Sequence, residues 1–375
     1  MLLSYKYRIY PNRTQAAALG EMLADFCQLY NAALEQRIAA YQRRSISLRY
    51  KDQSAELKAT RAAHDGLARW SYTAEQQVLR KLEKTFAAFF GRIRRGAKPG
   101  FPRFRARDRY HAADFRVADG LTIRKSGRLG FVGVPGEIKV RWHRPLPSKP
   151  KSAILTRRAG KWYIVFHVEI AAAEQQDGAA IGIDLGLTSL AALSTGELIA
   201  RPNHTKHAAK KLRRLQRALA RCKRGSTVRL KRKAVGAKLH AHIGNSRRDH
   251  LHKVSAALVA RFGRIAIEDL NIKGLAAGVL AKHVQDASWT QLVSMLDYKA
   301  EKAGGQIVKV NPRGTSQTCP ECGTVAVKML AERTHRCDCG CVLDRDVAAA
   351  MVIHYRAFGF WPGTGRGTPS QRDAA

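Results

Sequence analysis

The most informative segment of the chain reads Ala179-Ala-Ile-Gly-Ile-Asp-Leu-Gly-Leu-Thr-Ser-Leu-Ala-Ala-Leu-Ser-Thr-Gly-Glu-Leu-Ile-Ala200. It contains three short apolar stretches separated by turn residues, which is typical of strands joined by tight turns. The pattern predicts an antiparallel meander of three strands. Downstream we expect a strand at 264–267, a helix at about 288–303 and a strand at 306–310. Because a helix separates these later strands, they indicate the parallel half of a mixed sheet.

A long basic region joins the two halves of this sheet. Leucines at helical spacing, with Lys and Arg between them, run from about 204 to 260. Gly225-Ser-Thr227 interrupts the pattern, and Gly and Ser are common breakers of helices. We therefore expect a helical hairpin followed by a further helix.

The N-terminal half of the chain combines strands with helices. Strand-like segments between about 113 and 170 predict a small β-barrel or sandwich, which the alternating stretch Tyr5–Tyr10 extends. Residues 171–178 are expected to be a linker. The helical bundle inserted in this β-structure is expected to contain helices at about 15–42 (N-cap Thr14), 53–64 and 73–94 (cap Thr73).

The charge of the chain narrows the class of partner. Lys and Arg number 67 against 29 Asp and Glu, a formal net charge of +38, and nucleic acid is the commonest polyanion that neutralises such an excess. No apolar run approaches the roughly 18 residues that span a membrane. The first ten residues break their apolar stretch with charge too early for a signal peptide. We expect a soluble, cytoplasmic protein with no membrane partner.

Three acids stand at the ends of predicted strands or at the start of a helix. They are Asp184, Glu268 and Asp346. Acids at strand ends in one sheet can share two Mg²⁺ ions, which suits hydrolysis of a phosphodiester. Asp269 is the alternative to Glu268. We prefer Glu268, because this residue shares a strand face with the small Ala266, which leaves room for a metal and a substrate. Asp344 is the alternative to Asp346.

The segment 181–188 also fits a different activity. Ile181-Gly-Ile-Asp-Leu-Gly-Leu-Thr188 is similar to the first phosphate loop of actin-like ATPases and sugar kinases, which share the ribonuclease H-like fold. That function requires a second loop of the same kind, and none follows residue 188. Nor does it account for the net charge, so we rank the ATPase well behind a nuclease.

Five of the seven cysteines lie between residues 319 and 341. Such clustering indicates a metal site rather than a disulfide framework. The pairs Cys319/Cys322 and Cys337/Cys339 are each followed by Gly, and four thiolates give a closed, structural Zn²⁺ site. Cys341 or His335 remains an alternative for one ligand. Because this cluster precedes Asp346, zinc binding would fix the direction of the third carboxylate.

A proline- and glycine-rich segment at 92–107 alternates arginine with aromatic residues. Aromatic rings can stack on bases, and arginine can contact phosphates or stack on rings. A solvated basic loop explains the composition equally well. The nucleic-acid-binding candidates in this segment are Phe101, Arg103, Phe104 and Arg105.

Several motifs taken in order resemble the TnpB family, the OrfB-type proteins of bacterial insertion sequences. The motifs are Gly-Phe-Pro-Arg-Phe-Arg (100–105), Gly-Ile-Asp-Leu-Gly (182–186), Ile-Glu-Asp-Leu (267–270), Asp-Ala-Ser-Trp (286–289), Thr-Ser-Gln-Thr-Cys-Pro-Glu-Cys-Gly (315–323) and Asp-Arg-Asp (344–346). The resemblance covers about residues 5 to 355. The chain departs from the family at Ala348, where members usually have Asn, and in the second cysteine pair, which is one residue short.

The resemblance implies a multidomain α+β protein that acts as an RNA-guided DNA endonuclease. It also implies Mg²⁺ at Asp184, Glu268 and Asp346, a guide RNA and double-stranded target DNA as partners, a monomer with RNA, and a nucleoid location in the bacterial cytoplasm. The alternative is a catalytically silent RNA-guided repressor or transposition accessory protein. The expected domains are a wedge β-barrel at 1–175 with a helical recognition lobe inserted at about 13–98, a RuvC-like ribonuclease H-like domain at 178–318 and 342–357, a zinc ribbon at 319–341, and a disordered tail at 358–375.

Overall fold

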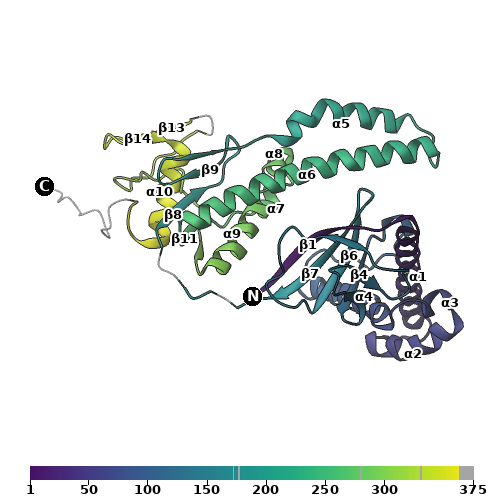
Figure 1. Cartoon of the computed structure of the whole chain (residues 1–375). Helices are drawn as coiled ribbons and strands as arrows, with labels where there is room; N and C mark the ends of the chain where they lie inside the picture. Colours follow the sequence, from purple (N-terminus) through teal and green to yellow (C-terminus); the bar gives the residue numbers. More distant parts are fainter. Residues whose placement is uncertain (172, 176–177, 279–280, 330–331, 363–375) are drawn as a thin grey trace. The chain divides into compact units, whose positions relative to one another are not determined.

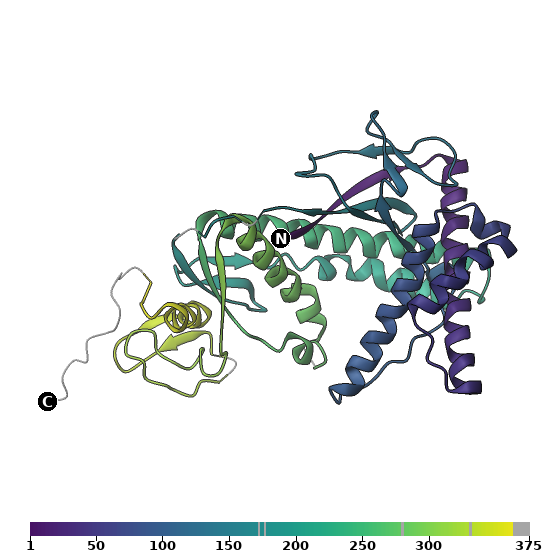
Figure 2. The same cartoon turned by 90° about the horizontal axis from the view of Figure 1, so that it is seen from below.

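The computed structural model describes residues 1–171, 173–175, 178–278, 281–329 and 332–362. The chain forms two compact units, Met1–Ala171 and Ala172–Ala375 (Figure 1; Figure 2). In the described part of the chain, no helix is both long enough and apolar enough to cross a membrane.

The first unit is built on a sheet of seven strands that closes on itself. Its strand order is β4-β3-β2-β6-β7-β1-β5. Leu129 in β4 forms an antiparallel bridge with Ile138, the residue before β5, so the two edges meet and the expected barrel is confirmed. The strands are β1 (Leu2–Tyr10), β2 (Ala112–Val117), β3 (Gly120–Ile123), β4 (Leu129–Phe131), β5 (Lys139–Arg141), β6 (Ser152–Arg158) and β7 (Lys161–Glu169).

The helices of the first unit lie between β1 and β2 in sequence, as expected. They are α1 (Arg13–Arg44), α2 (Tyr50–Ala63), α3 (Asp65–Ala68), α4 (Tyr72–Arg94) and the short 3-10 helix η1 (Arg107–Arg109). Both expected N-caps are wrong. Asn12 caps α1 by accepting a hydrogen bond from the Gln15 amide, and Ser71 caps α4, because each has an extended backbone while Thr14 and Thr73 already lie inside their helices.

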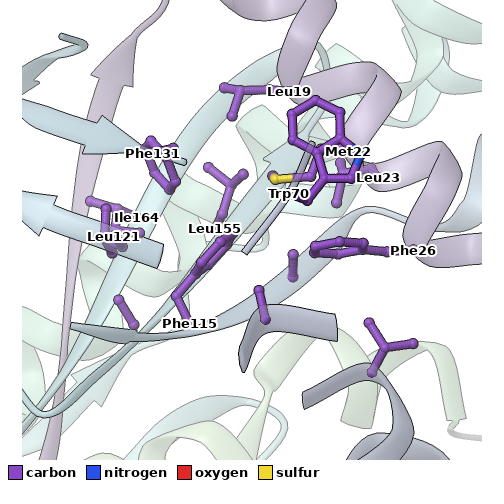
Figure 3. Close-up of a cluster of buried hydrophobic side chains, with 14 of the residues drawn as sticks. Leu19, Met22, Leu23, Phe26, Trp70, Phe115, Leu121, Phe131, Leu155 and Ile164 are labelled. Carbon is purple, nitrogen blue, oxygen red and sulfur yellow. The ribbon is translucent and has the colours of Figure 1, made fainter. Parts of the chain in front are cut away.

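Barrel and helices share one hydrophobic core. Apolar side chains of α1 point toward the strands, and Trp70 lies beside them (Figure 3). The indole of Trp70 donates a hydrogen bond to Asp25 Oδ2 (2.8 Å), which satisfies its buried N–H. The labelled core residues are Leu19, Met22, Leu23, Phe26, Trp70, Phe115, Leu121, Phe131, Leu155 and Ile164.

The second unit contains a five-stranded mixed sheet with the order β10-β9-β8-β11-β12. Strands β8, β9 and β10 form an antiparallel meander, and β8, β11 and β12 are parallel. The mixed sheet expected from the sequence is therefore confirmed. Its strands are β8 (Ala180–Asp184), β9 (Ser189–Leu193), β10 (Leu198–Ala200), β11 (Arg264–Glu268) and β12 (Gln306–Val310).

Helices pack against both faces of this sheet. Leu251 and Leu258 of α6, with Leu292 and Leu296 of α9, pack on one face, and α10 covers the other. The remaining part is a hairpin of β13 (Thr334–Arg336) and β14 (Val342–Asp344). The helices are α5 (His204–Ala220), α6 (Thr227–Arg261), α7 (Ile272–Leu275), α8 (Ala281–Ala287), α9 (Trp289–Ala303) and α10 (Arg345–Phe358).

The expected third helix after the basic hairpin is wrong, because α6 runs without a break from Thr227 to Arg261. Ser226 caps its start, and Ile243, Leu251 and Leu258 form a buried stripe at helical spacing along it. This packing outweighs the cost of the glycines inside the helix, about 1 kcal/mol each. Of the expected disordered tail, residues 363–375 lie outside the described residues, as do residues 172, 176 and 177 of the expected linker.

Candidate functional site

Two of the three predicted acids lie side by side at one edge of the mixed sheet. Strands β8 and β11 are parallel neighbours with Ile183 opposite Ile267, so Asp184 and Glu268 follow at the carboxyl ends of both strands. Adjacent strands are about 4.8 Å apart. Both side chains are half-buried. The edge thus places two carboxylates next to each other.

Asp346 reaches this edge from the first turn of α10. A Cβ atom added to Gly186 would lie 3.4 Å from Asp346 Oδ2, so this carboxylate faces the turn that follows β8. Gly182 makes the approach possible: a Cβ there would lie 2.6 Å from the His354 amide nitrogen of α10. The two glycines flanking Asp184 thus allow the helix and the third acid to come close.

Asp344 has a different position. Its carboxylate Oδ1 accepts hydrogen bonds from the backbone amides of Asp346 (2.9 Å) and Val347 (3.2 Å), so it caps α10. The side chain is exposed, whereas that of Asp346 is half-buried. Burial and the nearby Asp344 raise the pKa of Asp346, against the charges of Arg333 and Arg345.

The electrostatics show that the three acids influence one another. Burial first, and then the charges of Glu268 and Asp346, raise the pKa of Asp184 to about 8, against an opposing effect of Arg345. The carboxylate oxygens of the three acids do not all lie within 4.8 Å of one another, so these acids are farther apart than the four cysteines of this unit. The edge concentrates negative charge, which suits a divalent cation.

A residue without an assigned role in the sequence analysis supports Glu268. The hydroxyl of Thr315 is buried, donates a hydrogen bond to Glu268 Oε1 and lies 3.0 Å from the carbonyl oxygen of Pro312. Burial raises the pKa of Glu268, while the Thr315 hydrogen bond and the charge of Arg356 oppose the increase. The sequence signal for Thr315 was its place at the start of the Thr-Ser-Gln-Thr-Cys motif.

The reason given for preferring Glu268 to Asp269 is only half right. Asp269 is exposed, and Glu268 lies on the carboxylate edge. However, the Ala266 face does not leave room for substrate, because Ala266 is fully buried and packs with Ile353 of α10. The small alanine accommodates this helix, and the open position is at the strand end.

The cysteine cluster has the geometry of a four-thiolate site. The sulfurs of Cys319 and Cys339 are 3.7 Å apart, those of Cys322 and Cys337 are 3.4 Å apart, and all four lie within 4.8 Å of one another. A tetrahedron of sulfurs about 2.3 Å from zinc has edges of about 3.8 Å. The four residues therefore fit a zinc ion.

Glycine forms the turn of each pair of thiols. Gly323 and Gly340 have φ values of +75° and +94°, which disfavour other residues. Cys341 and His335 are buried beside Cys319, and the three also lie within 4.8 Å of one another, so the alternative ligand remains open. The cluster lies immediately before Asp344, the last residue of β14.

The basic aromatic loop belongs to the first unit, whereas the acids and cysteines belong to the second. The ring of Phe101 packs against Phe89 (5.3 Å between centroids). Asn31 holds the backbone of Arg105 through two hydrogen bonds, of 2.8 and 2.9 Å. Phe104 is 56% exposed, and Arg103 is also exposed, so the loop is anchored but presents both side chains to solvent.

Three family models match the chain. The OrfB model of IS605, described as "Probable transposase", matches residues 163–278, and the "Cas12f1-like, TNB domain" matches residues 289–353. A "Helix-turn-helix domain" model matches residues 1–45, which form β1, α1 and the residue after it in this structure.

Curated relatives extend over most of the chain. A Streptomyces pristinaespiralis protein named "Putative RNA-guided DNA endonuclease" is 36% identical over 93% of this chain and 88% of its own length. The Escherichia coli K12 protein "Putative RNA-guided DNA endonuclease InsQ" is 31% identical over 70% of this chain and 68% of its own. A solved "Cas12f1-sgRNA-target DNA complex" has a similar fold, with a TM-score of 0.57, 14% identity, and coverage of 92% of this chain and 83% of that one.

Proposed function

This chain belongs to the OrfB family of insertion-sequence proteins, and from that membership we propose that it is an RNA-guided DNA endonuclease whose reaction takes place at Asp184, Glu268 and Asp346. The observation that carries the proposal is the convergence of three half-buried carboxylates on one sheet edge. Mutual repulsion helps to raise the pKa of Asp184 to about 8. A structural ion-pair network would instead pair each acid with a cation.

The carboxylates suit Mg²⁺, because oxygen ligands and concentrated negative charge are what this ion requires. Asp184, Glu268 and Asp346 would hold it. Two such ions supply Lewis acidity, an activated water and stabilisation of the leaving oxygen in phosphodiester hydrolysis. Thr315 orients Glu268 by its hydrogen bond, and the nearby charge of Arg356 favours the ionised form of that acid.

We assign a structural role to zinc at Cys319, Cys322, Cys337 and Cys339. The fit of the four sulfurs to a closed tetrahedron supports this role, because such a site leaves no position for a substrate. Only β14 separates the last cysteines from α10, so a folded ribbon would hold the helix start that carries Asp346.

The partners follow from the charge and from the relatives. A net charge of +38 favours binding of a guide RNA and a double-stranded DNA target.

The proposed division into wedge barrel, recognition lobe, RuvC-like domain and zinc ribbon is consistent with the two units and the cysteine cluster. We place the protein in the bacterial cytoplasm at the nucleoid, as a monomer with RNA. Phe101, Arg103, Phe104 and Arg105 are all exposed and are the candidates for nucleic-acid contacts in the first unit.

The test begins with RNA that copurifies with the full-length protein. Sequencing is expected to return one defined RNA species, whose variable segment selects the DNA that the complex cuts. Cutting is expected with Mg²⁺ and lost with EDTA. A defined RNA and guided binding without cutting under any divalent ion would identify a silent binder instead. Absence of any specific RNA would contradict the proposal.

A further inference from the structure

The hairpin of α5 and α6 is the most one-sidedly charged part of the chain. Between Leu198 and Arg248 the sequence contains 17 Lys and Arg but no Asp or Glu, and also no Phe, Trp or Tyr. No described residue of α5 is buried, and α6 is unburied until Ile243. Figure 1 shows α5 lying along the first part of α6, away from the sheet. The cations of α5 thus lie on unburied surface, and the hairpin's own sequence from Leu198 to Arg248 supplies no acid to neutralise them.

Cations and leucines occupy opposite sides of α5. At 3.6 residues per turn, Leu212, Leu215 and Leu219 share the side that is partly covered, toward α6. Six exposed cations lie within about 100° on the other side and extend along about 22 Å, at 1.5 Å per residue. These cations, which we call the α5 stripe, are Lys206, Lys210, Arg213, Arg214, Arg217 and Arg221.

The hairpin begins at the sheet edge that carries the acids. Strand β10 runs in the same direction as β8, because two antiparallel pairings separate them, so its end at Ala200 lies at the Asp184 edge. Asp286 fixes α5 and α6 together there. It accepts hydrogen bonds from the Thr205 hydroxyl (2.5 Å) and from Arg247 Nη2 (2.7 Å), so the carboxylate joins both helices at their base.

The form of the nucleic acid follows from which residues the hairpin contains. Proteins that hold unpaired strands place aromatic rings against the bases, and this hairpin has none. A row of cations without rings fits the outside of a double helix, where phosphates are presented and bases are stacked inside. The length of the stripe corresponds to about six or seven base pairs at 3.4 Å per step of one strand.

We propose that the α5 stripe binds the phosphate backbone of double-stranded DNA and aligns it with the carboxylate edge from which the hairpin projects. The choice of DNA rests on the proposed function, because the polymer that passes the carboxylates is the one to be cut. The contact is independent of sequence, since lysine and arginine on phosphates fix position without reading bases.

The test compares two charge-matched variants of the full-length protein. Arg213→Gln with Arg217→Gln removes two cations from the stripe. Lys231→Gln with Lys238→Gln removes two exposed cations from α6, on its side away from the α5 contact, and Gln has a helix propensity close to that of Lys and Arg. Circular dichroism establishes that both variants keep their helices.

Binding of a fluorescent DNA duplex with no guide match is measured by anisotropy at several salt concentrations. For the stripe variant, the slope of log K against log salt is expected to decrease in magnitude by about 1.8, or 0.9 for each lost phosphate contact. This corresponds to roughly 60-fold weaker binding at 0.1 M salt. The α6 variant is expected to keep the wild-type slope.

Equal losses in the two variants, or an unchanged slope in the stripe variant, would overturn the proposal. So would a loss confined to an RNA duplex or to single-stranded DNA of the same length. A reduced slope for duplex DNA together with absence of guided cleavage would leave the stripe as a DNA-binding surface and contradict only the proposed function.

Discussion

Replacing Asp184 by Asn is expected to make the metal-free protein more stable at neutral and alkaline pH, although it removes a residue from the proposed site. The folded protein holds the pKa of Asp184 at about 8, because of burial first and the charges of Glu268 and Asp346 second, against an ordinary value of 3.8. Between these pH values the unfolded chain releases the proton and the folded chain keeps it. Stability therefore falls as pH rises through this window, by up to about 1.4 kcal/mol per pH unit.

The full shift in the pKa of Asp184 corresponds to a decrease of roughly 6 kcal/mol in the free energy of unfolding. This value is an upper bound, because the site can relax and admit water. The neutral Asn side chain has the same shape and does not incur this cost. We expect Asp184→Asn to exceed the wild type by about 2 to 6 kcal/mol at pH 8 in EDTA, and the difference to disappear toward pH 4.

The assay is urea unfolding in EDTA at a series of pH values, followed by tryptophan fluorescence, to which Trp289 in the same unit as Asp184 contributes. Asp269→Asn is the matched control. The same change at this exposed neighbour is expected to leave the free energy of unfolding unchanged at each pH. A destabilised Asp184→Asn protein, or a difference that does not vary with pH, would refute the reasoning. Mg²⁺ is expected to stabilise the wild type at pH 8 and not the variant.

Three further predictions concern the support of the site. Gly182→Ala pushes α10 away from β8 and is expected to cost about 1–3 kcal/mol or more by urea unfolding, with loss of cleavage; near wild-type activity would contradict the close packing. Thr315→Val removes the hydrogen bond that lowers the pKa of Glu268, so the pH profile of cleavage is expected to shift to higher pH, and an unchanged profile would argue against this role. Cys322→Ser is expected to reduce bound zinc, measured by atomic absorption, and to slow cleavage by loosening Asp346, whereas full zinc content would exclude Cys322 as a ligand.

The sheet and its carboxylate edge could be predicted because their signals are local. The turn residues of 179–200 mark three strands, and the spacing of helices and strands after residue 264 marks parallel connections. The carboxyl ends of parallel strands lie at the same edge of a sheet, so the sequence could place Asp184 and Glu268 together. The paired cysteines with their glycines were equally local, since Gly323 and Gly340 both form turns with positive φ.

Features set by tertiary packing could not be predicted in the same way. The buried stripe on α6 keeps that helix continuous to Arg261, where the sequence pattern predicted a further helix after the hairpin. The face of Ala266 looked open because its cover, Ile353, comes from α10, far along the sequence. Thr315 approaches Glu268 only through the fold, and Asp286 likewise reaches Thr205 across distant elements. No periodic pattern in the sequence predicts contacts between residues that are so far apart along the chain.

The choice of Asp346 over its neighbour tests the central claim most directly. Asp346→Asn and Asp344→Asn are compared for cleavage of a guide-matched DNA duplex by the RNA-bound protein in Mg²⁺. Asn is as good an N-cap as Asp, so Asp344→Asn is expected to keep α10 capped and to cut near the wild-type rate, while Asp346→Asn is expected to bind the target without cutting it. Cleavage that survives in Asp346→Asn and is lost in Asp344→Asn would contradict the assignment of the three carboxylates.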